Sequence, residues 1–404
     1  MYNFLIDNLT QMAQQTNSLF SHLVCVECGK VYSKDLVSTV CDDPDCKSIL
    51  SAKYNLSSNT LTKEDLKNRP STLWRYKEFL PVLDVANIVS LGEGFTPILK
   101  LQNLPHIDGK NVLLKDESNN PTGSFKARGL SVAVSKAKEL GINTFVIPTA
   151  GNAGGALAAY AARAGLKAYV FMPKLTPNAF KAEAKLFGAE VTEVNGNISD
   201  CGKLANALAA ENGWFDVSTL KEPYRLEGKK TMGYEIAEQL NWSLPDVIFY
   251  PTGGGTGIIG IWKAFDELEE LGWIGSKRPR MIAVQSDSCN GIYKAFHNKE
   301  IRSEYIDNGF TVANGLRVPK PYADKVILEV LRDSLGDSVS VSDADILDAL
   351  YELSSKEGLF VAPEGAALWY AYKFLVKNGQ LDNAETVLLL NTGSGYKYLD
   401  NIQI

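Results

Sequence analysis

The chain has 404 residues, of which 45% are hydrophobic and 22% are charged, and it carries a formal net charge of −6. This length and composition predict a globular protein with two or more domains, each with its own core. The acidic balance offers no basic stripe to neutralise phosphates, and no apolar run approaches the roughly 20 residues of a membrane helix. We therefore expect no nucleic-acid partner, no membrane span, and a cytoplasmic protein that acts on small molecules.

Four cysteines are grouped near the beginning of the chain. Cys25 and Cys28 are separated by two residues, and Cys41 and Cys46 by four. In a reducing compartment this spacing is typical of thiolates that bind Zn²⁺ rather than of a disulfide framework. We expect a zinc-ribbon-like module over residues 1–55 in which the metal stabilises the fold. The alternative is a ribbon of the same shape without a bound metal.

Beyond this module the chain alternates short apolar runs with helical patterns. The runs are rich in β-branched residues, and the segments between them carry apolar residues at helical spacing. This alternation predicts βαβ units and mostly parallel sheets, whose strands are apolar because helices cover both faces. Ser342 and Asp345 have the spacing of a capping box at the beginning of a further helix. The predicted strands are residues 144–148, 167–173, 246–251, 280–285 and 386–391.

Unusual loops follow three of these runs. In an open α/β sheet ligands bind beyond the carboxyl ends of the strands, so we expect the site at these loops. The loop after Pro251 reads TGGGTG and precedes a helical pattern, and bare amides at the beginning of a helix bind phosphate. The other two loops contain Asn152 and Thr392. Taken singly, Asn152 also fits a helix cap and Thr392 an ordinary turn residue.

A lysine, Lys126, follows the turn formed by Pro121, Thr122 and Gly123. An amine, a phosphate cradle, an amide and a hydroxyl at adjacent strand ends are the groups that pyridoxal phosphate requires. We therefore predict a pyridoxal-phosphate site in which Lys126 is the nucleophile. The competing interpretation is a nicotinamide site, because the dinucleotide fingerprint is matched by Gly255, Gly257 and Gly260.

Six stretches, in this order along the chain, resemble the threonine synthases, which are fold-type II pyridoxal-phosphate enzymes also related to tryptophan synthase β. The likeness extends from about Val24 to Leu399, and the cysteine cluster resembles the ribbon that many members carry. The stretches are LGEGFTPILKL, KDESNNPTGSFKARG, AGN, KEPYRLEGKKT, PTGGGTG and NTGSGYK.

The resemblance implies an α/β fold with two three-layer αβα domains of mostly parallel sheet, next to the N-terminal module. It implies a large cofactor-binding domain over residues 56–117 and 219–404, and a small inserted domain over residues 118–218. It also implies a homodimer, since dimers are common among such enzymes.

The resemblance further implies roles for single residues. Lys126 would be linked covalently to pyridoxal phosphate, Asn152 would bond its phenolic oxygen, and Thr392 would face its ring nitrogen. The residues that would hold the phosphate of the cofactor are Gly253, Gly254, Gly255, Thr256 and Gly257. The candidates for binding a small phosphorylated amino acid are Thr122, Ser124, Arg128 and Lys230, with Lys229 as an additional cation.

We accordingly expect a lyase that converts O-phospho-L-homoserine and water to L-threonine and phosphate. The chain departs from typical threonine synthases in its GGGTG loop and in Ala127, Lys229 and Ser394, which stand where Asp, Gln and His are usual. The GGGTG loop also resembles those of threonine and serine dehydratases. The alternatives are therefore a dehydratase or a cysteate synthase that uses phosphoserine and sulfite. From other classes they are a nicotinamide oxidoreductase and a zinc-ribbon binding protein with a decayed catalytic half.

Overall fold

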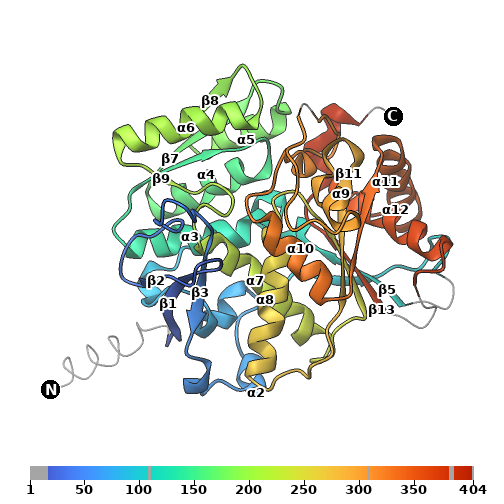
Figure 1. Cartoon of the computed structure of the whole chain (residues 1–404), viewed down its shortest axis with the longest axis horizontal. Coiled ribbons are helices and arrows are strands. Elements are labelled where there is room, and N and C mark those ends of the chain that lie inside the picture. The colour runs from blue at the N-terminus through green and yellow to red at the C-terminus, as the bar shows by residue number, and fades with distance from the viewer. Residues whose placement is uncertain (1–16, 108–110, 308, 382–385, 403–404) are drawn as a thin grey trace.

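Three separate sheets organise the chain (Figure 1), and a computed structural model describes residues 17–107, 111–307, 309–381 and 386–402. The N-terminal sheet is antiparallel, with the strand order β2-β1-β3. Its strands are β1 (Phe20–Cys25), β2 (Val31–Ser33) and β3 (Leu50–Tyr54), and the short helix α2 (Lys63–Leu66) follows.

The largest sheet has six strands in the order β12-β11-β10-β13-β5-β4, and every strand except β4 is parallel to its neighbours. The strands are β4 (Ile98–Lys100), β5 (Asn111–Asp116), β10 (Val247–Pro251), β11 (Arg280–Ser286), β12 (Asp337–Val341) and β13 (Thr386–Asn391). The helices are α7 (Tyr224–Gln239), α8 (Thr256–Glu270), α9 (Gly291–His297), α10 (Asp324–Asp333), α11 (Asp343–Glu357) and α12 (Pro363–Lys377).

Helices cover both faces of this sheet. Successive side chains of a strand point to opposite faces, so one strand contributes to a core on each side. Ile248 and Tyr250 of β10 share a core with α7, α8 and α10. Val247 and Phe249 of the same strand share a second core with α11 and α12. The result is a three-layer αβα arrangement, which explains why these strands are apolar throughout.

The remaining sheet has four parallel strands in the order β8-β7-β6-β9. Its strands are β6 (Thr144–Pro148), β7 (Lys167–Pro173), β8 (Glu190–Val194) and β9 (Phe215–Asp216), and its helices are α3 (Lys126–Glu139), α4 (Asn152–Ala164), α5 (Asn178–Leu186) and α6 (Ile198–Asn212). Phe145 and Ile147 pack with α3, α4 and α5, whereas Val146 packs with α6 on the opposite face. Within the described ranges, no helix is long and apolar enough to cross a membrane.

The α/β fold with mostly parallel sheets was correctly predicted from the sequence. The predicted strands are β6, β7, β10, β11 and β13, with β10 beginning one residue later and β11 ending one residue later than expected. The helix expected after Ser342 is α11, and Ser342 Oγ accepts a hydrogen bond from the Asp345 amide at 3.2 Å. The domain boundaries near residues 55, 117 and 218 stay a prediction.

A buried cluster of charges holds the beginning of α3. Arg128 donates from Nε to Glu117 Oε2 and from Nη1 to Glu235 Oε1, both at 2.5 Å, and all three side chains are fully buried. Lys115 at the end of β5 also pairs with Glu235, at 2.9 Å. Because α3 begins at Lys126, these ion pairs set the position of that lysine relative to β5 and α7.

We expect Glu235→Gln to lower the free energy of unfolding by about 3–5 kcal/mol, because it leaves buried cations without their carboxylate. Urea unfolding of the two proteins measures this difference. The control is Glu193→Gln, which breaks partly exposed pairs with Lys181 and Lys185 and should have a far smaller effect. Equal destabilisation by both variants would contradict the role assigned to the buried cluster.

Candidate active site

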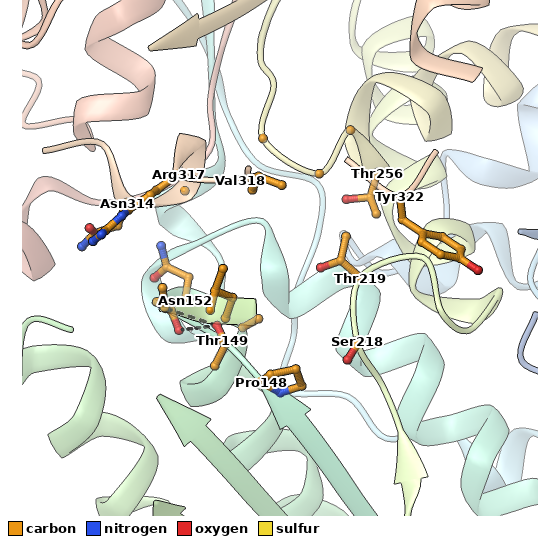
Figure 2. Close-up of a pocket in the computed structure, with 18 of the residues that line it drawn as sticks. Pro148, Thr149, Asn152, Ser218, Thr219, Thr256, Asn314, Arg317, Val318 and Tyr322 are labelled. Atoms are coloured by element: carbon orange, nitrogen blue, oxygen red, sulfur yellow. Dashed lines mark hydrogen bonds between the residues drawn. The ribbon is translucent and has the colours of Figure 1, made fainter. Parts of the chain in front are cut away.

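A cavity of about 460 Å³ lies where β6, β9, β10 and β13 end. Its wall contains residues that come within two positions of the ends of these strands, among them Thr149 after β6, Ser218 after β9 and Thr392 after β13. Figure 2 shows Thr149 and Asn152 on one side of this space and Ser218, Thr219 and Thr256 on the other. The site therefore lies at the carboxyl ends of the parallel strands, where ligands of open α/β sheets bind.

The structure brings together the residues predicted to contact the cofactor, with one exception. Those that line the cavity are Lys126, Asn152, Gly253, Gly254, Gly255, Thr256 and Thr392. Gly257 is not part of the lining, and a Cβ atom placed on it would lie 1.8 Å from Tyr250 Oη. This glycine allows α8 to pack closely against β10, and its contact with the cofactor phosphate stays a prediction.

The turn before Lys126 is hydrogen-bonded to the segment after β13. The Ser394 amide donates to the Gly123 carbonyl at 3.0 Å, and the Phe125 amide donates to the Thr392 carbonyl at 3.0 Å. Gly123 has a φ of 59°, in the left-handed region that glycine adopts at no steric cost. These bonds place Lys126 and Thr392 on the same cavity although they are distant in the sequence.

The amine of Lys126 has an unusual protonation equilibrium. Desolvation and the nearby Arg225 guanidinium lower the pKa of Lys126 to about 7, against an opposing effect of the Glu364 carboxyl. A large fraction of this amine is consequently neutral at neutral pH, and the neutral form is the nucleophile. Arg225 itself donates from Nη1 to the Val217 carbonyl at 2.5 Å.

Close contacts favour glycine at three positions of the glycine loop. Cβ atoms on Gly253, Gly254 and Gly255 would lie 2.1 Å from the Gly315 carbonyl oxygen, 2.7 Å from Thr219 Cγ2 and 2.2 Å from Ile327 Cδ1. The loop leads directly into α8, whose first turn has no side-chain cap. Its backbone therefore presents amides and the positive end of a helix to the cavity, which suits a phosphate.

Two unsatisfied polar atoms indicate that the cavity takes a polar ligand. Glu364 Oε2 and Asn314 Nδ2 belong to residues of the cavity wall, are buried, and have no hydrogen-bond partner among the described residues. Buried polar atoms are normally paired, so a ligand with donors and acceptors completes this wall. An activated amine, an anion-binding loop and these open positions fit pyridoxal phosphate.

The residues predicted to bind the substrate do not line the cavity. Arg128 is neutralised by the buried cluster described above. Lys230 Nζ pairs with Glu227 at 2.7 Å and with Glu267 at 2.9 Å, above the ring of Tyr54 from the cysteine module. Buried carboxylates hold both cations, and the prediction that Arg128 and Lys230 bind a substrate phosphate stays a prediction.

Thr122, Ser124 and Lys229, which were also predicted to bind the substrate, lie outside the cavity wall as well. Ser124 is fully buried and pairs with Gly393 in an isolated β-bridge, and the Thr122 hydroxyl is buried beside it in the turn. Lys229 has no hydrogen-bond partner within the described residues, and desolvation together with neighbouring cations lowers its pKa well below 10.5. These residues do not line the cavity, and their role in binding a substrate phosphate stays a prediction.

Other cations do reach the cavity, and the sequence analysis missed them. They are Lys203, Lys221, Arg317 and Lys320. Arg317 donates from Nε to the Gly309 carbonyl at 2.8 Å and lies over the ring of Phe310. Figure 2 places Arg317 on the same side of the cavity as Asn152. Arg317 lies outside any helix or strand, so no periodic pattern could have identified it.

The four clustered cysteines lie close enough together to bind one metal ion, as the sequence predicted. Their sulfur atoms all lie within 4.8 Å of one another. Cys25 Sγ is 3.4 Å from Cys46 Sγ, and Cys28 Sγ is 3.6 Å from Cys41 Sγ. With bonds of about 2.3 Å, four thiolates around Zn²⁺ lie about 3.8 Å apart, so this arrangement is compatible with a tetrahedral site.

Comparison with known proteins identifies the family. The sequence profile described as "Pyridoxal-phosphate dependent enzyme" matches residues 89–393. The chain belongs to this family. It is 36% identical over 377 residues to a threonine synthase of Methanocaldococcus jannaschii, and the match covers 92% of each chain. A threonine synthase of Methanosarcina acetivorans is 37% identical over 374 residues, covering 92% of this chain and 91% of that protein.

A solved structure of another protein has the same fold. Diaminopropionate ammonia lyase from Escherichia coli superimposes with a TM-score of 0.65 at 21% identity, covering 76% of this chain and 85% of that chain. The pyridoxal-phosphate cofactor and the fold-type II architecture predicted from the sequence are thus those of the family to which the chain belongs, and the roles of single residues toward the cofactor stay predictions.

We expect covalent capture of pyridoxal phosphate by the apoprotein to accelerate with rising pH, with a midpoint near pH 7 and a plateau at higher pH. The reason is that only the neutral amine reacts, and the pKa of Lys126 is lowered to about 7. Quenching with borohydride at several pH values, followed by mass spectrometry of the Lys126 peptide, measures the rate. A midpoint near 10.5, or equal labelling in Lys126→Ala, would contradict this assignment.

Proposed function

We propose that this protein is a threonine synthase, a pyridoxal-phosphate-dependent lyase that converts O-phospho-L-homoserine and water to L-threonine and phosphate. The observation that carries this proposal is the 36% identity with a threonine synthase over 92% of both chains.

The dinucleotide fingerprint has a simpler explanation in helix packing. A Cβ on Gly257 or Gly260 would crowd Tyr250 or the backbone amide of Lys230.

We assign the cofactor contacts as follows. Lys126 Nζ attaches the cofactor, and Asn152 donates to its phenolic oxygen. Thr392 faces its ring nitrogen, and the backbone from Gly253 to Thr256 holds its phosphate. When bound, the cofactor supplies an electron sink that stabilises negative charge on the substrate carbons. Lys126, being neutral near pH 7, can accept the proton of Cα.

The reaction also requires a site for the phosphate of the substrate. One proton leaves Cα and one leaves Cβ, and the Cγ–O bond breaks to release phosphate. Cγ then takes up one proton and becomes a methyl group, the hydroxyl of water bonds to Cβ, and a proton returns to Cα. We assign Arg317 to this phosphate, because the residue lines the cavity on the side of Asn152 and charge-assisted bonds to phosphate are strong. Unlike Arg128 and Lys230, Arg317 is part of the cavity wall.

We further propose that Cys25, Cys28, Cys41 and Cys46 bind one structural Zn²⁺. The cysteine module contacts the segment that carries Arg317, so the metal would support the cavity wall indirectly. Glu27, between the first two cysteines, accepts from Arg302 at 2.9 Å and from Lys325 at 3.1 Å. Tyr322 of the cavity wall donates to the Lys47 carbonyl. The homodimer and the cytoplasmic location stay predictions of the sequence.

We expect metal analysis of the purified protein to find one zinc per chain, and chelation to lower the thermal unfolding temperature before activity falls. The reason is that the binding free energy of a structural zinc contributes to folding. Cys28→Ser should have the same effect as the chelator. Absence of zinc from carefully purified protein, or loss of chemistry in Cys28→Ser without loss of stability, would argue against this site.

We expect phosphate release from O-phosphohomoserine to exceed ammonia release from threonine by at least roughly a hundredfold in kcat/KM, which corresponds to about 2.7 kcal/mol. A dehydratase acts on an uncharged hydroxyl and gains nothing from a cation at Arg317. Arg317→Met should therefore reduce the preference mainly by raising KM for the phosphorylated substrate. Parallel assays of phosphate and keto-acid formation measure both activities.

The same assays separate the related activities. Deamination of threonine or serine as fast as turnover of the phosphorylated compound would identify a dehydratase. Efficient formation of cysteate from phosphoserine and sulfite would identify a cysteate synthase. Either result contradicts the threonine synthase assignment and leaves the cofactor site intact.

A further inference from the structure

Lys397 makes contacts that the proposed chemistry does not use. It lies in the short helix η8 (Gly395–Asn401) and is not part of the cavity wall. Its Nζ donates to Asn152 Oδ1 at 3.1 Å, to the Thr122 carbonyl at 2.5 Å and to both carboxylate oxygens of Glu183 at 2.8 Å. An ammonium has three protons and accepts no hydrogen bond, so these three groups occupy all its donors.

The contact with Lys397 determines the direction of the Asn152 amide. The two ends of an amide have nearly the same shape, and their hydrogen-bond partners decide which end is oxygen. Because Lys397 can only donate, it must face Oδ1, and Nδ2 is turned away from it. Nδ2 makes only a long contact, 3.5 Å, with Tyr398 Oη of the cavity wall. Figure 2 shows this amide extending from the beginning of α4 into the cavity.

Packing and charge hold Lys397 in this position. The side chains of Lys397 and Glu183 are each 15% exposed, and Glu183 comes from α5. The acceptors belong to the turn before α3, the beginning of α4 and α5, so one ammonium joins three segments. A mostly buried ion pair with further hydrogen bonds is costly to break, because each partner would be left without its counter-charge.

We infer that Lys397 is a positioning residue that keeps Asn152 Nδ2 directed toward the phenolic oxygen of the cofactor. This role rests on the one proposed above for Asn152. Without Lys397, the amide of Asn152 can rotate, and its oxygen can then oppose the oxygen of the cofactor. Two acceptors facing each other would weaken cofactor binding even though Asn152 is still present.

The first test is Lys397→Met, which retains a long apolar side chain and removes the donor. We expect the dissociation constant of pyridoxal phosphate to rise about tenfold or more, as for the loss of a hydrogen bond to a charged group. We also expect the absorbance maximum of the bound cofactor to shift, since the partner of its phenolic oxygen changes. Titration of the apoprotein, followed by absorbance, measures both without any assay of turnover.

The matched control is Lys185→Met, on the same helix α5 as Glu183. Lys185 is half-exposed and pairs with Glu193 at 3.2 Å, away from the cavity wall. This variant should leave the affinity and the spectrum unchanged. If Lys397→Met does not fold because Glu183 loses its cation, the double variant Lys397→Met with Glu183→Gln removes both charges and is titrated in its place.

A double-mutant cycle with Asn152→Ala separates positioning from a general structural effect. If Lys397 acts through Asn152, adding Lys397→Met to Asn152→Ala should weaken cofactor binding little further. Independent effects that multiply would overturn the inference, and so would an unchanged affinity and spectrum in Lys397→Met alone. If Asn152→Ala itself changes neither affinity nor spectrum, the proposed role of Asn152 fails, and the role of Lys397 fails with it.

Discussion

The ion pairs of Arg128 with Glu117 and Glu235 are the interaction on which the geometry of the site depends. All three side chains are fully buried, and buried charges are tolerated only where they are paired and hydrogen-bonded. Glu117 directly follows β5 and Glu235 lies in α7, so pairing brings the beginning of α3 to the end of the large sheet. Lys126 precedes Arg128 by two residues, and its position follows from this arrangement.

A second set of contacts holds the other side of Lys126. The turn before it is bonded to residues 392–394, and the Thr122 carbonyl accepts from Lys397. The lysine therefore lies between two fixed points, one in α3 and one at the end of β13. Such preorganisation places the amine against the cavity before any ligand binds, which is what efficient chemistry requires.

Local patterns in the sequence predicted five of the parallel strands, β6, β7, β10, β11 and β13, and most of the proposed cofactor-binding residues line the cavity. The apolar runs predicted parallel strands, because a strand that helices cover on both faces is apolar throughout. The glycine loop, Asn152 and Thr392 follow such runs, where ligands bind, and Lys126 follows the turn. The close packing of Gly257 against the Tyr250 hydroxyl beneath α8 is a constraint that no local pattern reveals.

The sequence could not show which cations are available to a substrate, because ion-pair partners from other helices are distant in the sequence. Arg128 and Lys230 belong to conspicuous motifs, yet Glu235 and Glu267 neutralise them from other helices. Arg317 and Glu364 line the cavity from a segment without regular structure and from the beginning of α12. Charge alone therefore does not identify a ligand-binding cation, and burial and pairing decide which cations are available.

The most direct test is a crystal structure of the protein purified with pyridoxal phosphate. We predict continuous electron density from Lys126 Nζ to the cofactor, with its phosphate on the backbone from Gly253 to Thr256. A cofactor attached to another lysine such as Lys229, or bound away from this cavity, would contradict the account.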